Sequence, residues 1–591
     1  MTTRRHSPEL PPELLLQSSH LIAAMHRPSR TSVHSRLTRL TRVLPVFVWG
    51  RSYSFSDNFV NDLLAGLTVS TLVIPQGMAY AVTTSLPPVY GLYTSIFPPL
   101  VFFFFARSPY QNIGPTAVVS VMVSQVCTSA MTWLKEQNLL SLQASGTEAL
   151  AQTVLKTEYA EVVMLVTFLV GIVQFTVCSL GLGARLVTLI PDSLVSGFMA
   201  SSGICVLVIQ LKAIFGIAVQ QFDGSFSLIL TLFDIIKKLP TTNLCSFGLA
   251  VLAYIFMLAI QRLERYLSVH IPRWISNTRS VSSYVSLDSE SIIPKKPPAP
   301  VTDVILTVLL VAFITIFFDL PNTFGVETIG PIPSGFPTPT LPWAMLTRLP
   351  LKTVAKLILK ILPDCISLAL ICFVTTFSIS KTFESTTHTP DHASANDHSQ
   401  DLVAVSFATI GSSFLSAYIP CGSISRGALL ATQTNVTSPV GSLVSVFCVS
   451  IILLFLGSWF QNVPLSSLGT IVVVALFGVL AKIQTGFALI HEAREQRKIV
   501  WEEIVAVKHD MLRRSACTNG ETRWLLDAEV EDQRTVQIDQ ADLWLLRRKF
   551  VGLHREVVVW WVTFLTVIFV DAGSGILVGM VVSCLFILIA Q

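Results

Sequence analysis

Long apolar segments separated by short polar ones recur along most of this 591-residue chain. Clear examples are DLLAGLTVSTLVIPQGMAYAV, VVMLVTFLVGIVQFTVCSL, VILTVLLVAFITIFF and VVVWWVTFLTVIFV. Runs of this kind approach or exceed the ~20 residues that an α-helix needs to cross a bilayer. The pattern predicts an all-α polytopic membrane protein, because a helix satisfies its backbone hydrogen bonds within one span.

The polar interruptions carry charges that predict the side of the membrane each one faces. Residues 1–55, 262–300 and 484–554 contain clusters of Lys and Arg, which mark cytoplasmic segments. Residues 128–158 are polar without a basic excess, as expected of an outside loop. We therefore expect a poorly ordered cytoplasmic segment at 1–55, followed by one transmembrane domain at 56–591 with cytoplasmic inserts at 262–300 and 484–554.

Composition supports the membrane interpretation. Hydrophobic residues make up 52% of the chain and charged residues only 13%, which is rare in soluble domains. The first forty residues contain no apolar stretch that ends in a small-residue cleavage site, so we expect the first span to direct insertion. The ten cysteines lie mostly inside apolar segments without paired spacing, which favours small buried side chains over disulfides.

Two apolar runs are too short or too interrupted for simple spans. IGPTAVVSVMV opens with Gly114 and Pro115, and CGSISRGALLATQ opens with Gly422 and Ser423, so each starts with a helix-start signal. Each run predicts a half-helix. A pair of interrupted helices, one in each half of a chain, is typical of the binding site of an inverted-repeat transporter.

Arg426 places a permanent charge in the first turn of the second half-helix. Two helix N-termini that met near the bilayer midplane would each direct about half a positive charge at one point. The hydroxyls of Ser423, Ser425 and Thr116 lie near that point in the sequence, which predicts a site for a small anion. Two alternatives are an ion pair, for which Asp364 is the candidate acid, and a side chain that reaches an interface.

Motifs of other functional classes are missing from the sequence or weak. It contains no phosphate-binding loop, nucleophile elbow or metalloprotease helix, which argues against an enzyme and against an ATP-driven pump. The cluster His388, His392 and His398 with Asp391 and Asp397 lies among Pro, Ser, Thr and Asn, which favours a solvated loop over a metal site. We expect no cofactor, no metal and no nucleic-acid partner.

The order of the motifs resembles one family of membrane proteins. DLLAGLTVSTLVIPQGMAYA, LPPVYGLYTSIFPPLV, IGPTAVVS, LPDCISLALICFVTTFSISKTF and SISRGALL follow one another as in the sulfate permease family of anion transporters, which includes prestin, pendrin and the sulfate carriers. The resemblance implies about fourteen transmembrane segments in two inverted repeats of seven, with a uracil-permease-like core that moves against a gate. It also implies a homodimer.

The resemblance adds two residues of the first span, Gln76 and Tyr80, to the expected anion site. Gln76 follows Pro75, where a broken turn would free its amide to bind the anion; the alternative is an amide that bonds the backbone beside a proline kink. At the position of Thr116 the family often has an aromatic residue. A hydroxyl there favours an oxyanion such as sulfate over a bare halide.

Three further departures from the family pattern change the expectations. Thr375 stands where many bacterial and plant relatives carry a Glu linked to proton coupling, which favours exchange or uniport over proton symport. ARSP replaces the usual GTSR, so Arg107 is displaced and the contacts of its loop stay open. The sequence ends at Gln591, before the C-terminal sulfate-transporter and anti-sigma-factor-antagonist domain that the family normally carries, so we expect either a truncated gene model or a loss of regulation and dimerisation through that domain.

Together these observations predict a secondary-active transporter that exchanges sulfate, chloride, bicarbonate or oxalate by alternating access. One alternative is an anion channel or a voltage-responsive motor-like member, and another is a non-transporting, degenerate scaffold. We expect a multi-pass protein of the plasma membrane, with an internal membrane as the alternative, and with both termini in the cytoplasm.

Overall fold

The computed structural model of the chain describes most of the apolar segments. The described residues are 44–136, 148–183, 191–219, 226–270, 303–333, 335–384, 395–423, 426–427, 429–430, 439–518 and 554–590. Their α-helices are α3 (Val46–Ser52), α4 (Phe55–Thr83), α5 (Pro88–Phe105), α6 (Ala117–Glu136), α7 (Glu148–Ser179), α9 (Asp192–Phe215), α10 (Ser227–Lys238), α11 (Leu244–His270), α12 (Asp303–Phe317), α13 (Leu320–Phe324), α14 (Leu351–Glu384), α15 (Ala395–Phe414), α17 (Val440–Ile451), α18 (Gly457–Phe460), α19 (Leu465–Leu480), α20 (Lys482–Thr518) and α22 (Ala572–Ala590). Residues 554–569 are helical as well.

Nine helices of the described segments are long and apolar enough to cross a membrane. Large apolar side chains remain exposed on the outer surface of the bundle, among them Leu244 (81% exposed), Phe455 (75%) and Phe317 (70%). Water would not tolerate such a surface, whereas lipid tails would cover it. The chain is therefore a multi-pass membrane protein, and the prediction of an all-α polytopic fold is confirmed. The count of fourteen segments stays a prediction.

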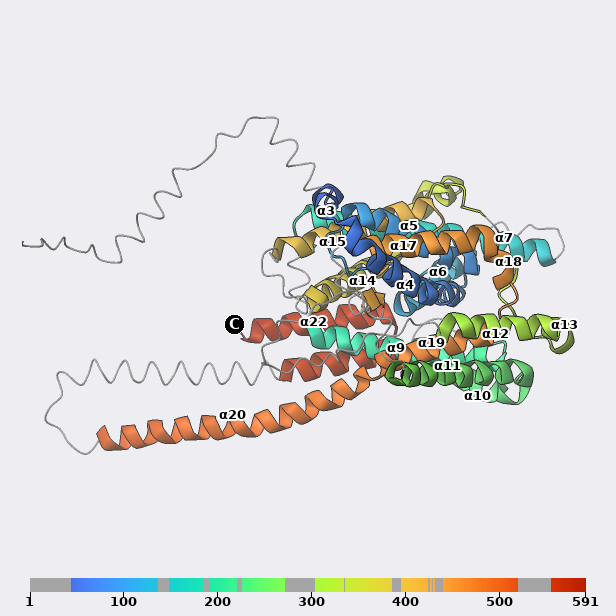
Figure 1. Cartoon of the computed structure of the whole chain (residues 1–591). Helices are drawn as coiled ribbons and strands as arrows, with labels where there is room; N and C mark the ends of the chain where they lie inside the picture. Colours follow the sequence, from blue (N-terminus) through green and yellow to red (C-terminus); the bar gives the residue numbers. More distant parts are fainter. Residues whose placement is uncertain are drawn as a thin grey trace, which may run out of the picture.

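The helices form two layers, which are visible one above the other in Figure 1. The upper layer holds α4, α5, α6, α7, α14, α15 and α17, and the lower layer holds α9, α11, α12, α19 and α22. Each layer mixes the two halves of the chain: α4 packs against α17, α7 against α15, and α9 against α19. Segments far apart in the sequence thus share one core.

Glycines allow the closest helix contacts within the upper layer. A Cβ atom on Gly91 of α5 would collide with the carbonyl group of Gly77 on α4, so the two backbones touch there. Gly66 of α4 stands in the same relation to α17, where a Cβ atom would lie 2.5 Å from the carbonyl oxygen of Gly441. Small residues at such crossings are typical of helix pairs in membranes.

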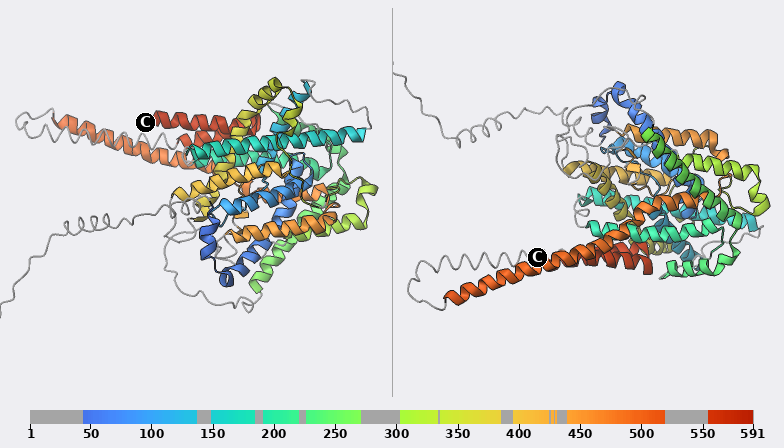
Figure 2. Two further views of the ribbon diagram at one scale, coloured as in Figure 1. Left: turned by 90° about the horizontal axis from the view of Figure 1, so that it is seen from above. Right: turned by 60° about the horizontal axis from the view of Figure 1, so that its bottom comes forward.

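The predicted polar segments are partly helical. Val46–Ser52 forms α3 inside the segment 1–55, and residues 1–43 lie outside the described part. The first half of the insert 484–554 belongs to α20, a single helix of 37 residues that extends away from both layers (Figure 2). The insert 262–300 contains the end of α11, and the rest of it lies outside the described residues.

Candidate functional site

Two extended segments cross in the upper layer, and each comes immediately before one of the predicted half-helices in the sequence. The amide of Gly114 donates a hydrogen bond of 3.0 Å to the carbonyl oxygen of Cys421, and the amide of Cys421 donates one of 2.9 Å to the carbonyl oxygen of Gly114. The pair is antiparallel and buried. This crossing joins the two halves of the chain at one point.

Proline explains why the backbone is extended on both sides of the crossing. Pro115 follows Gly114, and Pro420 precedes Cys421; a proline disfavours the helical conformation of the residue before it. Helix α6 begins only at Ala117. It is 20 residues long, about 30 Å at 1.5 Å per residue, so it is longer than the predicted half-helix. Arg426 is the first described helical residue of the second run.

Arg426 is buried beside the crossing, with only 2% of its surface exposed. Its Nη2 donates a hydrogen bond of 2.8 Å to the carbonyl oxygen of Pro115, and its Nη1 lies 3.5 Å from Oδ1 of Asn112. Its Nε has no hydrogen-bond partner among the residues that the structure describes. The ion pairs of the described residues do not include Arg426, and its burial excludes a side chain that reaches an interface.

Asp364, the acid considered as a partner for Arg426, lies in a different environment. A Cβ atom placed on Gly573 would lie 3.3 Å from Oδ1 of Asp364 and 3.2 Å from Oδ1 of Asp571. Asp364 therefore faces a second carboxylate on the other layer of helices. The ion pair between Asp364 and Arg426 is not formed in the described part of the chain.

A buried guanidinium surrounded by neutral groups is costly. The side chains that act electrostatically on Arg426 are those of Tyr80, Tyr418 and Cys421. Each of them is uncharged when protonated. Removing a cation from water without a counter-charge costs several kcal/mol, of the order found for buried ions. The arrangement therefore favours a bound anion, whose charge would offset that cost.

The other predicted site residues differ in how deeply they are buried. Tyr80 and Gln76 of α4 are 7% and 5% exposed. Thr116 and Ser423 are half-buried, at the starts of the two helical runs. Ser425 lies outside the described residues.

The local geometry of Gln76 differs from the prediction. Helix α4 runs without a break from Phe55 to Thr83 and contains Pro75, so the expected broken turn is wrong. The side chain of Gln76 makes no hydrogen bond to any part of the chain that the structure describes, which also argues against an amide held by the kinked backbone.

Several residues of the site were missed from the sequence. Asn112 donates a 2.9 Å hydrogen bond to Oγ of Ser442, which orients its Oδ1 toward Arg426. The hydroxyl of Tyr418 lies 3.1 Å from that of Ser120. Polar side chains immediately before a Gly-Pro pair, as in QNIGP, were a usable signal for Asn112, whereas Tyr418 is joined to the site only through the tertiary fold.

Asp401 supports the loop that leads to the crossing. Its Oδ1 accepts hydrogen bonds from the backbone amides of Arg107 (3.0 Å) and Ser108 (3.2 Å), and its Oδ2 accepts one from Oγ of Ser380 (2.8 Å). Gln111 donates a further hydrogen bond of 2.9 Å to Oγ of Ser380. The backbone of the ARSP loop is thus anchored to α15, and the side chain of Gln111 links the following residues to α14.

The histidine cluster adds little to this picture. His388, Asp391 and His392 lie outside the described residues. Among the residues that are described, no three His, Cys, Asp or Glu side chains come together as metal ligands would.

Comparisons with known proteins agree with one another. The model of the sulfate permease family matches residues 59–500. Solute carrier family 26 member 9 of Xenopus tropicalis is 26% identical over 452 residues, covering 76% of this chain and 50% of that protein. Prestin of Mus musculus is 28% identical over 443 residues, covering 74% of this chain and 52% of prestin. This chain thus spans about half the length of the curated relatives it matches.

Solved structures show the same fold. The murine solute carrier 26 family member A9 anion transporter, in an inward-facing state, superposes with a TM-score of 0.66 at 22% identity, covering 100% of this chain and 77% of that chain. The transmembrane domain of the cyanobacterial bicarbonate transporter BicA gives a TM-score of 0.53 at 18% identity, covering 72% of this chain and 90% of that domain.

Proposed function

Because the chain belongs to the sulfate permease family, we propose that it carries small inorganic anions across a membrane as a secondary-active exchanger. The proposed substrates are sulfate, chloride, bicarbonate and oxalate. The movement is alternating access, in which the layer that holds the crossing moves against the other layer.

The buried guanidinium of Arg426 is the observation that carries this proposal. This positively charged group is only 2% exposed, and its hydrogen-bond acceptors are a carbonyl oxygen and an amide oxygen. Its Nε donor is not bonded to any described residue. An anion at this point would accept charge-assisted hydrogen bonds, which are about twice as strong as neutral ones. Arg426 lies in the first turn of the predicted second half-helix, so the positive end of that helix would add to its field.

The remaining residues of the proposed site supply neutral donors. Ser423 and Thr116 offer hydroxyls at the starts of the two helical runs. Ser425, which lies outside the described residues, is proposed with them from the sequence. Gln76 offers an amide without a partner in the described part of the chain, and the hydroxyl of Tyr80 lies within electrostatic range of Arg426. Several donors directed at one point would replace the water that a sulfate or chloride ion loses on entry.

Exchange is proposed because Thr375 stands beside the crossing. Its hydroxyl lies 2.8 Å from Sγ of Cys421 and donates to the carbonyl oxygen of Ile371 (2.8 Å). A threonine there offers no carboxylate to carry a proton. The gradients of the anions themselves would then drive transport.

We propose further that the protein works in the plasma membrane, as a homodimer with cytoplasmic termini. The segments 1–55, 262–300 and 484–554 would then face the cytoplasm. The basic residues of these segments support the orientation.

Uptake of radiolabelled sulfate into proteoliposomes tests the proposal, with and without chloride or bicarbonate inside. We expect internal anion to stimulate uptake in the wild-type protein. Arg426→Gln removes the charge and should abolish uptake without preventing insertion. Arg348→Gln is the matched control, because Arg348 is exposed and only pairs with the carboxylate of Glu161 at 3.3 Å.

Other outcomes would identify the alternatives. Electrical current without matched counter-anion flux would indicate a channel or a voltage-responsive member. Well-folded protein that binds no anion would indicate a non-transporting scaffold. Normal uptake by a correctly inserted Arg426→Gln protein would refute the proposed site.

A further inference from the structure

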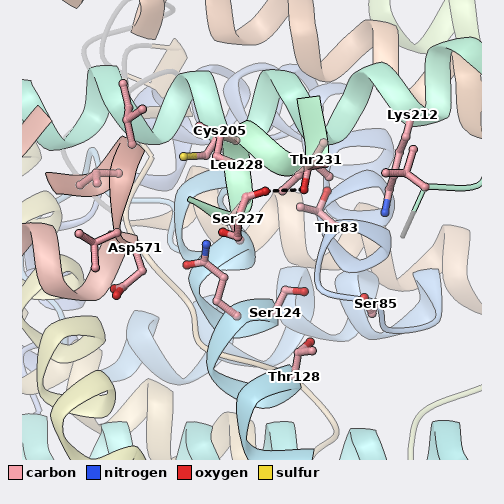
Figure 3. Close-up of a pocket in the computed structure, with 17 residues that line it drawn as sticks. Thr83, Ser85, Ser124, Thr128, Cys205, Lys212, Ser227, Leu228, Thr231 and Asp571 are labelled. Atoms are coloured by element: carbon pink, nitrogen blue, oxygen red, sulfur yellow. Dashed lines mark hydrogen bonds between the residues drawn. The ribbon is translucent and has the colours of Figure 1, made fainter. Parts of the chain in front are cut away.

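A second polar cavity lies between the two layers of helices. Its volume is about 130 Å³. It is lined by the end of α4, by α6, by the second half of α9, by the start of α10 and by residues 567–571 (Figure 3). Since one water takes about 30 Å³ in the liquid, the cavity has room for several waters or a small hydrated ion.

The cavity lies at the end of the bundle opposite to α20. Helix α20 starts beside the first half of α9, where Nζ of Lys482 lies 2.9 Å from Sδ of Met199. The cavity is lined instead by the second half of α9, including Cys205 and Lys212. With the proposed orientation, it would open toward the outside.

Lys212 contributes a positive charge to this cavity. Its ammonium forms no hydrogen bond or ion pair to the described residues, and the carboxylate that acts on it electrostatically is that of Glu327, an exposed residue. In Figure 3 its side chain extends from α9 toward Thr83 and Ser85. A half-buried ammonium without a direct partner among the described residues would gain from a bound anion.

The other side of the cavity adds donors that suit the same ligand. Hydroxyls of Ser85, Ser124 and Thr128 line it, together with the amide of Gln125. The same three hydroxyls also lie within hydrogen-bond reach of the Tyr159 hydroxyl, which holds them together at this wall. Hydroxyls and amides of this kind donate hydrogen bonds to oxyanions.

Helix α10, 12 residues long, begins at the cavity, and Ser227 and Leu228 of its first turn line the wall. The residue before it, Phe226, provides no side-chain cap for the free amides. The uncapped N-terminus thus adds partial positive charge to that of Lys212.

One acid also lines the cavity. Asp571 lies on the far side from Lys212 in Figure 3. Its carboxylate already accepts hydrogen bonds of 2.7 Å from the backbone amide and from Oγ of Ser574. Repulsion from this carboxylate would keep a bound anion on the Lys212 side of the cavity.

We propose that this cavity is a second anion site, which binds small inorganic oxyanions such as sulfate through Lys212 and the surrounding hydroxyls. The site would collect the anion at the outer end before it reaches Arg426. This staging role rests on the proposed function, whereas binding at Lys212 does not depend on transport.

Binding of radiolabelled sulfate to the purified full-length chain tests the proposal directly. The Arg426→Gln protein, which lacks the first site, should still bind sulfate. Adding Lys212→Gln or Lys212→Met should weaken this remaining binding by about tenfold, because a charge-assisted contact is lost. Lys212→Arg should retain it. Lys237→Gln, which removes an exposed charge from α10 outside the cavity, is the matched control.

Two results would overturn the second site: no sulfate binding by the folded Arg426→Gln protein, or remaining binding that is unchanged by both Lys212 substitutions. Thermal unfolding establishes that each variant is folded. If one of the two Lys212 replacements fails to fold, the other still tests the site. In proteoliposomes, Lys212→Gln alone should raise KM for outside sulfate while kcat stays unchanged. If no uptake is seen at all but binding depends on Lys212, the transport proposal fails and the second site stands.

Discussion

Gly114 and Arg426 lie so close together that no side chain fits between them. A Cβ atom on Gly114 would stand 2.6 Å from Nη1 of Arg426, and the next neighbour, the carbonyl oxygen of Thr94, would be 3.5 Å away. The glycine is therefore required by the position of the guanidinium. Its backbone does not require it, because Gly114 is not among the residues with positive φ.

Gly114→Ala should therefore impair the site more than the fold. The new methyl group would push the guanidinium away from the carbonyl oxygen of Pro115, since the end of a long side chain moves more easily than the backbone. We expect sulfate uptake to fall by about tenfold or more, as a small misplacement of a binding group commonly costs. The measurement is initial uptake rate at equal reconstituted protein.

The control for this substitution is Gly248→Ala in α11, where a Cβ atom would meet nothing within 4 Å. Its uptake and its melting temperature should match the wild type. A Gly114→Ala protein that melts normally and transports normally would show that Arg426 does not need its present position.

Gly91→Ala should act on the fold itself. The added Cβ atom would collide with the carbonyl group of Gly77, so α4 and α5 would have to move apart. Overpacking that moves backbone typically costs about 1–3 kcal/mol, occasionally more. We expect a lower melting temperature in detergent and less monodisperse protein.

Gly411→Ala provides the comparison for Gly91→Ala. A Cβ atom there would lie 3.4 Å from Cγ2 of Val101, which can adjust, so the melting temperature should change little. Equal melting temperatures of the two variants would contradict the close approach of α4 and α5.

Asp401→Ala should loosen the loop before the crossing. The substitution removes the acceptor of two backbone amides and of the Ser380 hydroxyl, on a residue that is 2% exposed. Leaving buried donors without a partner costs about 1–3 kcal/mol. Thermal unfolding should show the loss, and uptake should fall with it because the loop positions Gly114.

Asp234→Ala removes a carboxylate that pairs with Lys238 at 3.0 Å at the surface of α10. Pairs of this kind contribute about 0–1 kcal/mol, so the melting temperature should hardly move. If the melting temperature of the Asp401→Ala protein fell as little as that of Asp234→Ala, the hydrogen bonds of Asp401 would not support the loop.

The sequence predicted the class of the fold and the position of Arg426, but not which backbone segments meet beside it. Apolar length and the Gly-Pro start of α6 are local signals, and the structure agrees with them. The pairing of Gly114 with Cys421 joins residues from opposite halves of the chain, which no local pattern reveals. For the same reason, Asp364 was a plausible acid in the sequence although it faces Asp571 in space.

Helix continuity was the other weak point. Pro75 predicted a broken turn, yet α4 continues through it because the neighbouring helices hold both sides of the proline in place. The sequence predicted the segment after residue 484 only as a charged cytoplasmic insert. Helix α20 shows that charged residues in helix-favouring order extend the helix well beyond the apolar part.

Thr375→Glu should make transport depend on pH. Thr375 is 9% exposed and its hydroxyl touches Sγ of Cys421, next to Gly114 and Arg426. A carboxyl group there would be neutral at low pH and negative at high pH. In its negative form it would pair with Arg426 and repel the anion. Sulfate uptake by the variant should therefore be high at acid pH and fall as the pH rises.

The matching substitution is Thr375→Gln, which has nearly the same size and no titratable group. Its uptake should follow the pH profile of the wild type, so any extra pH dependence in the Thr375→Glu protein belongs to the carboxylate. The profile should be measured as initial uptake between pH 5 and pH 8, with equal pH on both sides of the membrane. Identical profiles for the two variants would mean that position 375 does not share the electrostatic field of Arg426, and the anion would have to bind elsewhere.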